Sequence, residues 1–312
     1  MLKIRSLLNT RLLIPATLSL VVFSGVHAAD EMVRVPQADL GIKINGEYQR
    51  VNEYVVPKEH IIGDGTIAYE GPGIESGKVA FRLYLDERSV LDIFGKKTSE
   101  PVLHLVGRGD DYHSMAGWGM DILKVGNSLG SGGLGVYEND KMRMVGPARQ
   151  LSVKILDSNP AIAEFMVTHD GLSGDSGEFG LQTRYSMSAT SRLLNVQAKS
   201  SGNAPPIAAG LVKHPGTELI ESTNEGDSNW AYLATYGVQT LNDDELGLAL
   251  FYPLREVSKS VDDGSTIGVV FNTEQAIHYK VAAAWVEEPG GIKDIDAFRA
   301  YLEDVLSKLE DH

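Results

Sequence analysis

Apolar and polar residues alternate along much of the chain, which is the pattern of β-strands that are buried on one face. In the segment VAFRLYLD (79–86) the apolar residues share one face, and Arg82, Tyr84 and Asp86 share the other. The segment LQTRYSMS (181–188) has the same period of two. Five further segments bounded by turn residues are predicted as strands: AIAEFMVTH (161–169), RLLNVQAKS (192–200), NWAYLATYG (229–237), ELGLALFYP (245–253) and IHYKVAAAWVE (277–287).

A convincing long helical period occurs only near the C-terminus, where Asp294 or Asp296 is placed to cap the helix start. Its apolar positions are Phe298, Leu302, Val305, Leu306 and Leu309. The chain is therefore predicted to be mainly β, a large antiparallel β-sandwich with a C-terminal helix. Irregular strand and loop lengths favour a sandwich over a barrel. No internal repeat or convincing linker divides residues 29–312, so we expect one domain.

The N-terminus has the pattern of a secretory signal peptide. Three basic residues, Lys3, Arg5 and Arg11, precede an apolar run of 14 residues and a small-residue cleavage site at Ala28. A membrane-spanning helix needs about 20 apolar residues, so an uncleaved anchor is the weaker interpretation. We expect residues 1–28 to be removed and the mature protein to be periplasmic or secreted, with no stable membrane anchor.

Composition and charge narrow the possible functions. The chain has no cysteine, which excludes disulfides, thiol catalysis and thiolate metal ligands. Loss of the three basic residues of the leader leaves 25 of the 28 Lys and Arg against 42 Asp and Glu, a net charge of −17. Nonspecific binding to nucleic acid is therefore not expected. An acidic glycan remains a possible partner, because a local group of cations can outweigh the global field.

The densest group of reactive side chains lies in residues 110–135, DDYHSMAGWGMDILKVGNSLGSGGLG, a segment with seven glycines. Its candidate side chains are Asp110, Asp111, Tyr112, His113, Trp118, Asp121 and Lys124. Long loops on β scaffolds often carry sites. A Tyr-His pair can share acid and base work, and a tryptophan can stack on a sugar ring. The alternative is that Tyr112 and Trp118 pin the loop to the core while its charges face solvent.

The glycines of this segment match a dinucleotide fingerprint only formally. Gly130, Gly132 and Gly135 have the GxGxxG spacing, but the residues that follow are strand-like, and no strand-helix alternation surrounds them. Glycines that permit positive φ or close backbone approach are the better explanation.

Two other groups are candidates for function. Lys213 and His214 follow an apolar segment, which would place a cation and an imidazole at a strand end. Arg82 and Tyr84 lie two residues apart on one strand face; the alternative for Arg82 is a surface ion pair with Asp86 or Glu87.

No organic cofactor is expected. A structural calcium ion at Asp110, Asp111 and His113 is favoured over a catalytic zinc ion, because no HxH or HExxH spacing occurs.

Four segments together resemble the family known as domain of unknown function 4861, in the same order and over about Tyr69 to Lys308. They are YEGPGIESGKVAFRLYLDERSVLDIFGKK (69–97), the segment 110–135, LVKHPG (211–216) and WAYLATYGVQTLNDDELGLALFYP (230–253). The resemblance implies an exported bacterial protein of polysaccharide utilisation, with a super-sandwich similar to that of galactose mutarotase. It further implies a fold shared with sugar epimerases and polysaccharide lyases, which does not choose a reaction.

The residues favour β-elimination on a uronate-containing polysaccharide or oligosaccharide, by a lyase or dehydratase. Such a reaction needs a base, cations for the developing charge and an acid for the departing group. The candidates are His113 or His214 as base, Arg82, Lys124 or Lys213 as cations, and Tyr112 or Tyr84 as acid. A glycoside hydrolase that uses Asp110, Asp111 and Asp121 stays open. So does a non-catalytic sugar-binding protein with an aromatic platform of Trp118, Trp230, Tyr232 and Tyr236, although the last three also fit a core face.

Overall fold

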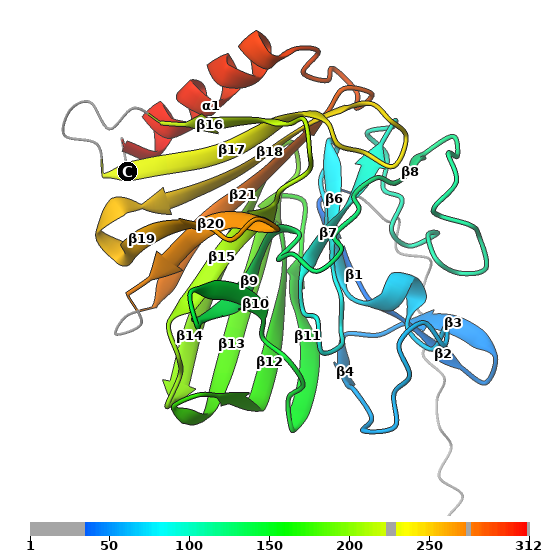
Figure 1. Ribbon diagram of the computed structural model, residues 1–312. Helices are drawn as coiled ribbons and strands as arrows, with labels where there is room; N and C mark the ends of the chain where they lie inside the picture. Colours follow the sequence, from blue (N-terminus) through cyan, green and yellow to red (C-terminus); the bar gives the residue numbers. More distant parts are fainter. Residues whose placement is uncertain (1–34, 223–228, 273–275, 311–312) are drawn as a thin grey trace, which may run out of the picture. The chain divides into compact units, whose positions relative to one another are not determined.

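Antiparallel β-sheets make up most of the protein (Figure 1). The computed structural model describes residues 35–222, 229–272 and 276–310, which belong to one compact unit. The predicted leader, residues 1–28 with its cleavage site, lies outside the described residues.

The largest sheet has nine strands, and all of its pairings are antiparallel. Its spatial order is β16 (Glu218–Glu221), β17 (Trp230–Val238), β18 (Glu245–Pro253), β21 (Ile277–Trp285), β14 (Leu193–Gly202), β13 (Gly177–Ser188), β12 (Ile162–Gly174), β11 (Gln150–Ser158) and β4 (Glu53–Val55).

Two five-stranded sheets and one hairpin complete the β structure. The first five-stranded sheet has the order β1 (Gln37–Asp39), β5 (Gly73–Glu75), β6 (Val79–Leu83), β7 (Leu91–Lys96) and β8 (Gly119–Asp121). The second has the order β10 (Lys141–Met144), β9 (Ser131–Glu138), β15 (Ile207–Val212), β20 (Thr266–Phe271) and β19 (Val257–Asp262). The remaining elements are the hairpin of β2 (Gly41–Ile44) and β3 (Glu47–Arg50), and the short 3₁₀ helices η1 (Ala68–Glu70) and η2 (Leu254–Glu256).

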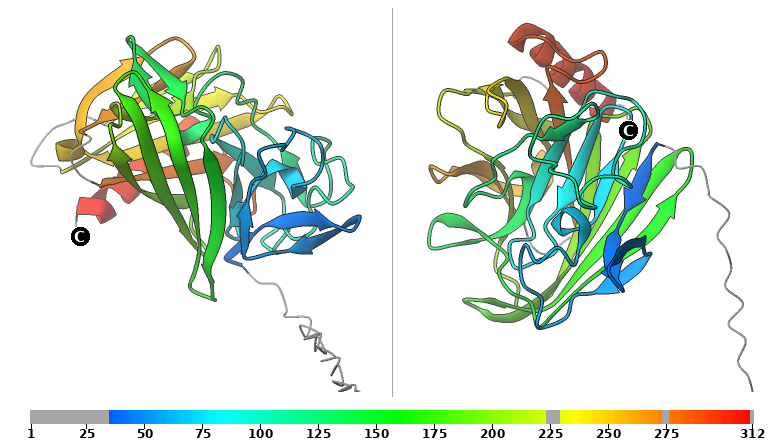
Figure 2. Two further views of the ribbon diagram at one scale, coloured as in Figure 1. Left: turned by 90° about the horizontal axis from the view of Figure 1, so that it is seen from below. Right: turned by 90° about the vertical axis from the view of Figure 1, so that its right-hand side faces the viewer.

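The inner faces of the sheets meet in one large apolar core, which confirms the predicted sandwich. Strand β13 shows why these residues form it: Leu181, Tyr185 and Met187 are buried on one face, and the intervening residues lie toward solvent. Strands β1 and β5 pack against β12, so the first five-stranded sheet lies beside the nine-stranded one (Figure 1 and Figure 2).

Strand β6 differs from its predicted alternation. The apolar face of Phe81 and Leu83 is buried as expected, but Arg82 on the opposite face is also buried, with 1% exposure. The reason is a second apolar cluster that covers this face, built from η1, β7 and the loop after β7 and including Tyr69 and Phe94. The surface ion pair considered for Arg82 is therefore wrong, and this residue pairs with buried carboxylates instead.

The C-terminal helix α1 (Ile295–Glu310) is confirmed. The Asp294 carboxylate accepts a hydrogen bond from the Ala297 amide at 2.8 Å, so Asp294 rather than Asp296 caps the helix. Phe298 and Leu302 of α1 pack on the outer face of β17 and β18. Tyr232 and Tyr236, which belong to β17, are buried in the same apolar cluster. Their burial supports a core role for these two tyrosines.

Two glycines of the segment 110–135 explain why it is rich in this residue. At Gly119 a Cβ atom would lie 1.7 Å from the Gly95 carbonyl oxygen, and at Gly130 it would lie 2.0 Å from that of Leu91. Both residues have positive φ, which favours glycine. The segment therefore runs close against β7 and continues into strand β9, so the context of a dinucleotide fingerprint is absent.

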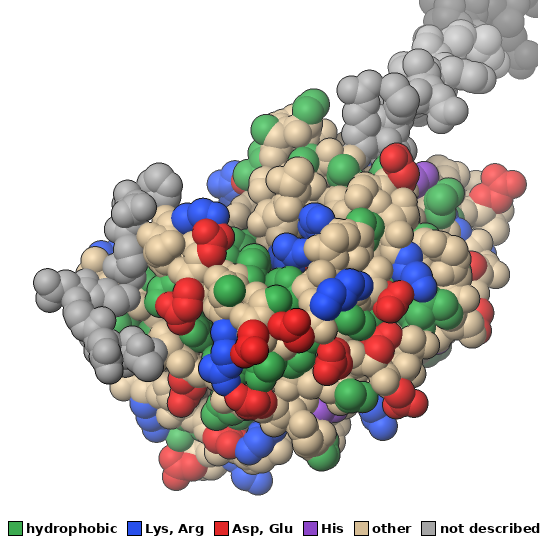
Figure 3. All heavy atoms as spheres, turned by 90° about the horizontal axis from the view of Figure 1, so that it is seen from above, with side chains coloured by type: hydrophobic (Ala, Val, Ile, Leu, Met, Phe, Trp, Pro, Cys, Tyr) green, Lys and Arg blue, Asp and Glu red, His purple; other side chains and the backbone are tan. Residues whose placement is uncertain are grey.

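The face that carries α1 mixes acidic and basic side chains, without a dominant sign (Figure 3). Its ion pairs include Arg299 with Glu218 and Lys308 with Asp304. Within the described ranges, no helix has the length and apolar character needed to cross a membrane.

Candidate functional site

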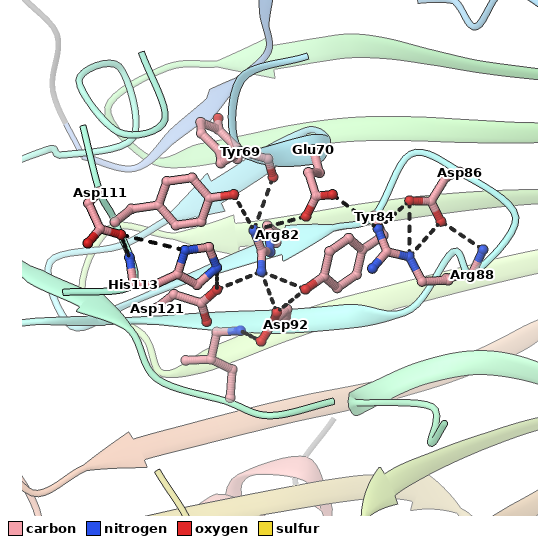
Figure 4. A network of polar contacts seen from close by, with 12 residues as sticks. Tyr69, Glu70, Arg82, Tyr84, Asp86, Arg88, Asp92, Asp111, His113 and Asp121 are labelled. Atoms are coloured by element: carbon pink, nitrogen blue, oxygen red, sulfur yellow. Dashed lines mark hydrogen bonds and ion pairs between the residues drawn. The ribbon is translucent and has the colours of Figure 1, made fainter. Parts of the chain in front are cut away.

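Arg82 is the centre of a buried polar network on the outer face of β6 (Figure 4). Its Nη2 donates to Asp92 Oδ2 at 2.7 Å and to Asp121 Oδ2 at 2.6 Å. It also lies 2.6 Å from the Tyr84 hydroxyl, which donates to Asp92 at 2.7 Å. The strand register explains this geometry. Arg82 on β6 is opposite Asp92 on β7, and Asp121 on β8 is opposite Phe94, two residues after Asp92 on β7. One guanidinium group thus holds two carboxylates inside the protein.

The loop between β7 and β8 brings Tyr112 and His113 onto this network. Their rings are in contact at a tilt of 33° with centroids 4.3 Å apart, and the Tyr112 hydroxyl lies 3.4 Å from Arg82 Nη1. His113 Nε2 lies 3.5 Å from Asp121 Oδ2, while Nδ1 lies 3.8 Å from Asp111 Oδ1 (Figure 4). The His113 side chain is 57% exposed, whereas Asp121 is buried. The His113 side chain therefore lies between the buried charged groups and the solvent.

Burial changes the acidity of the groups in this network. Burial, followed by the neighbouring charge of Asp92, raises the pKa of Asp121 to about 8, and Arg82 opposes this shift. Burial also raises the pKa of Tyr84 and Tyr112. Burial thus favours the protonated form of Asp121 while the ion pair with Arg82 favours its carboxylate, and both tyrosines keep their protons.

Tyr112 and His113 line one wall of a pocket of about 300 Å³, here named the first pocket. Its full lining is Tyr48, His60, Gly63, Asp64, Gly65, Ile67, Tyr69, Glu70, Asp86, Gly107, Tyr112 and His113. The volume is at the lower end of the range of about 300–1,000 Å³ for small-molecule sites. Polar groups and aromatic rings share the surface of this pocket.

An unusual backbone conformation places Glu70 in this pocket. Tyr69 and Glu70 are consecutive non-glycine residues with φ of 40° and 64°, in the left-handed region. Glu70 Oε2 lies 3.8 Å from Arg82 Nη1, and Glu70 Oε1 lies 3.4 Å from Arg88 Nη2. Arg88 also binds the Asp86 carboxylate, at 2.5 Å. Two acidic residues of the lining are thus partly neutralised by arginines outside it.

The three carboxylates considered for a hydrolase do not enclose an open space. Asp110 accepts a hydrogen bond from the Arg108 amide at 3.0 Å, in an exposed turn. Asp111 and Asp121 lie on the two nitrogens of His113, so the imidazole occupies the space between them. A pair of glycosidase carboxylates must instead face the scissile bond with the substrate between them. The geometry therefore gives this alternative less support than acid-base chemistry at His113.

Lys124, Lys213 and His214 form a second group that does not join the Arg82 network. His214 is half-buried beside Lys124, and burial lowers the pKa of His214. Lys213 is exposed and pairs with Asp262 at 2.5 Å. None of the three lines the first pocket. The sequence-predicted candidates therefore separate, with Arg82, Tyr84, Tyr112 and His113 in one group and these three in another.

Trp118 packs on the same core residue as Tyr112. Its ring packs edge-on against Phe94 at 6.0 Å, and the Tyr112 ring contacts Phe94 in the same manner at 5.7 Å. Trp118 is half-buried and does not line the first pocket. This contact agrees with the alternative in which the aromatic residues pin the loop.

Metal binding gains no support from the geometry. Over the described parts of the chain, no three His, Asp or Glu side chains are grouped as ligands of one ion. The set Asp110, Asp111 and His113 does not form such a group, and Asp111 instead accepts a hydrogen bond from the Ser114 hydroxyl at 2.6 Å.

Sequence reasoning missed several residues of the site, namely His60, Tyr69, Glu70, Arg88 and Asp92. A signal existed for Asp92, because it interrupts the apolar run of β7, and a charge in such a run needs a buried partner. Tyr69 and Glu70 had no such signal, since their left-handed conformation is imposed by the surrounding structure.

Two solved structures show weak likeness to this chain. A proposed aldose 1-epimerase of Klebsiella pneumoniae matches with 12% identity and a TM-score of 0.38, over 77% of this chain and 83% of its own. A mutant glycoside hydrolase family 81 enzyme of Clostridium thermocellum matches with 10% identity and a TM-score of 0.30, over 68% of this chain and 22% of its own. Scores this low carry no argument about function.

Sequence comparison gives a clearer result. No curated protein matches the chain. The family described as "Domain of unknown function (DUF4861)" matches residues 24–312, which includes every residue of the Arg82 network and of the first pocket. The resemblance found in the four sequence segments is thereby confirmed, and the chain belongs to the DUF4861 family.

Proposed function

We propose that this protein is a carbohydrate-active enzyme that performs β-elimination, as a lyase or a dehydratase, on uronate-containing glycans or oligosaccharides. The observation that carries the proposal is the contact of exposed His113 with buried Asp121 at the wall of a polar pocket, beside Tyr112. A base oriented by a buried acidic side chain, with an acid next to it, is the arrangement that proton abstraction and leaving-group protonation require.

In the proposed step, His113 takes the proton from the carbon next to the uronate carboxylate. The electrons of that C–H bond form the C=C bond, and the electrons of the breaking C–O bond leave with the oxygen. Tyr112 gives its proton to this oxygen, which departs as water in a dehydration or as a sugar hydroxyl in a lyase reaction. Burial raises the pKa of Tyr112, so it carries a proton to donate.

Arg82 acts in this scheme through Tyr112. Its side chain is 1% exposed and bound to Asp92 and Asp121, so it is a positioning residue without substrate contact. Its Nη1 lies 3.4 Å from the Tyr112 oxygen, where its charge stabilises the phenolate that forms when Tyr112 gives up its proton. Tyr84 holds Asp92 and, being buried, has a structural role.

The test is incubation with a panel of uronate polymers and of their unsaturated oligosaccharides. Elimination makes or consumes a conjugated uronate double bond, so the ultraviolet absorbance changes, and dehydration lowers the product mass by one water. Hydrolysis adds water without making that chromophore. Glycans that are bound and recovered unaltered would instead support the binding-protein alternative.

We further propose that the protein is exported, with the mature chain beginning at Ala29. The support is the basic, apolar and small-residue pattern of residues 1–28. N-terminal sequencing of the protein from periplasm or medium should start at Ala29; a membrane-bound form that keeps Met1 would contradict this proposal.

A further inference from the structure

A second pocket adjoins the first and shares two residues with it. The second pocket has a volume of about 400 Å³, and His60 and Asp86 line both pockets. Each pocket alone reaches the size of about 300 Å³ at which small-molecule sites begin. The two pockets therefore meet at these side chains.

One loop forms part of both pockets. The segment 57–66, between β4 and η1, gives Gly63, Asp64 and Gly65 to the first pocket and Pro57, Lys58 and Ile62 to the second, with His60 in both. The loop end is fixed in place: the Tyr48 hydroxyl donates to the Gly65 carbonyl at 2.6 Å, and the Lys43 amide donates to the Thr66 carbonyl at 2.8 Å. His60 lies in the same loop, at the junction of the two pockets.

The second pocket has its own polar groups. His169 lies on β12, buried, with Nε2 at 2.6 Å from the Ser89 hydroxyl. Gln150 begins β11, and both Gln150 and Lys58 are exposed side chains of this lining. Val56 and Leu151 add apolar surface. Hydrogen-bonding groups around a small apolar surface suit a pyranose ring.

His60 and Asp86, which line both pockets, keep polar atoms available to a ligand. Asp86 is held by Arg88, with Oδ2 at 2.5 Å from Nη2 and Oδ1 at 2.8 Å from the Arg88 amide. Its carboxylate is therefore fixed and largely neutralised, so it does not repel an acidic sugar strongly. The His60 amide donates a hydrogen bond to the Pro57 carbonyl at 3.1 Å, which holds the backbone of this residue and leaves its ring nitrogens out of the contact.

We propose that the second pocket is a subsite for the sugar residue adjacent to the one that reacts, and that His60 is a specificity-determining residue that contacts both sugars. The substrate is then an oligosaccharide or polymer of at least two residues that spans the two pockets. This inference rests on the proposed function, which places the reacting sugar in the first pocket.

Binding, measured separately from turnover, tests the inference. The probes are D-glucuronic acid, a glucuronate-containing disaccharide and the matching tetrasaccharide, titrated calorimetrically into the His113→Ala protein so that no probe is consumed. We expect the disaccharide to bind at least about tenfold more tightly than the monosaccharide, a difference of about 1.4 kcal/mol. A failure of the elimination proposal would leave this comparison intact, because it needs no reaction.

Two added substitutions locate the extra affinity. Gln150→Trp fills the second pocket from an exposed position and should remove the gain, and His60→Ala should reduce it. Gln182→Trp, an exposed residue on β13 that lines neither pocket, is the matched control and should keep it. Equal affinity for monosaccharide and disaccharide, a gain that survives Gln150→Trp, or no measurable binding of any probe would overturn the inference.

Discussion

His113 Nε2 lies 3.5 Å from Asp121 Oδ2, and the two side chains differ sharply in exposure, 57% against 3%. The buried member is further bound to Arg82, which also holds Asp92. An exposed imidazole thus lies against a buried carboxyl group that Arg82 holds in place before any substrate arrives. This is the relationship that general acid-base catalysis uses, in which the orienting group does not itself contact substrate.

The raised pKa of Asp121 should make stability depend on pH. The folded-state pKa of about 8 lies above the ordinary value of 3.8, so the folded protein binds more protons than the unfolded chain between these values. The contribution of Asp121 to the free energy of unfolding should therefore fall as pH rises through this range. Asp121→Asn should remove that part of the slope in denaturant unfolding from pH 5 to 9; an unchanged slope would contradict the assignment.

Arg82 should be far more important to stability than a surface arginine. Arg82→Met would leave Asp92 and Asp121 buried without their cation, which typically costs about 3–5 kcal/mol. Arg184→Met is the control, because the Arg184 side chain is 49% exposed in its pair with Glu164 and should cost at most about 1 kcal/mol. Similar losses for the two variants in urea unfolding would show that the network contributes little.

The strand pattern of this chain was predictable because most strands bury one face. The alternation of residues 181–188 corresponds to β13, and the spacing of Phe298 and Leu302 corresponds to α1. Strand β6 was only half predictable, since its second face is covered by residues distant in sequence, such as Leu103. Alternation reports which residues share a face and does not report what covers that face.

The loop residues of the candidate site were predictable from the sequence, and the residues that they contact were not. Tyr112 and His113 were found because reactive side chains are concentrated there. Their convergence with Arg82 depends on strand register, which places Asp92 and Asp121 on neighbouring strands. His214 was an equally good candidate by sequence, and its position in a separate group follows from the fold.

The close approach of Gly130 to β7 can be tested against a neighbouring glycine. Gly130 and Gly126 have similar positive φ, 69° and 58°, but only at Gly130 would a Cβ atom meet backbone. Gly126→Ala should cost about 1–2 kcal/mol from backbone strain alone. Gly130→Ala should lower the melting temperature further, because the Leu91 carbonyl must move; equal losses would show that the approach is not tight.

His169 should make the protein sensitive to mild acid. Burial lowers the pKa of His169 to about 4 from 6.5, with the Leu181 backbone opposing the shift. The unfolded chain then binds the extra proton first, so the contribution of His169 to stability should be lost as pH falls from 6.5 toward 4. His169→Gln should flatten the dependence of the melting temperature over this range, whereas wild-type and variant curves that run parallel would contradict the shift.

The most direct test of the account is the turnover rate of the His113→Ala protein on a uronate oligosaccharide that wild type converts, with the melting temperature measured on the same sample. Loss of a general base should lower the rate by about 10²–10⁴-fold. The melting temperature should stay within a few degrees, because the side chain is 57% exposed. His278→Ala, a half-exposed histidine that lines neither pocket, should keep wild-type turnover. Wild-type turnover in His113→Ala, or a rate lost only together with the fold, would contradict the proposed role of His113.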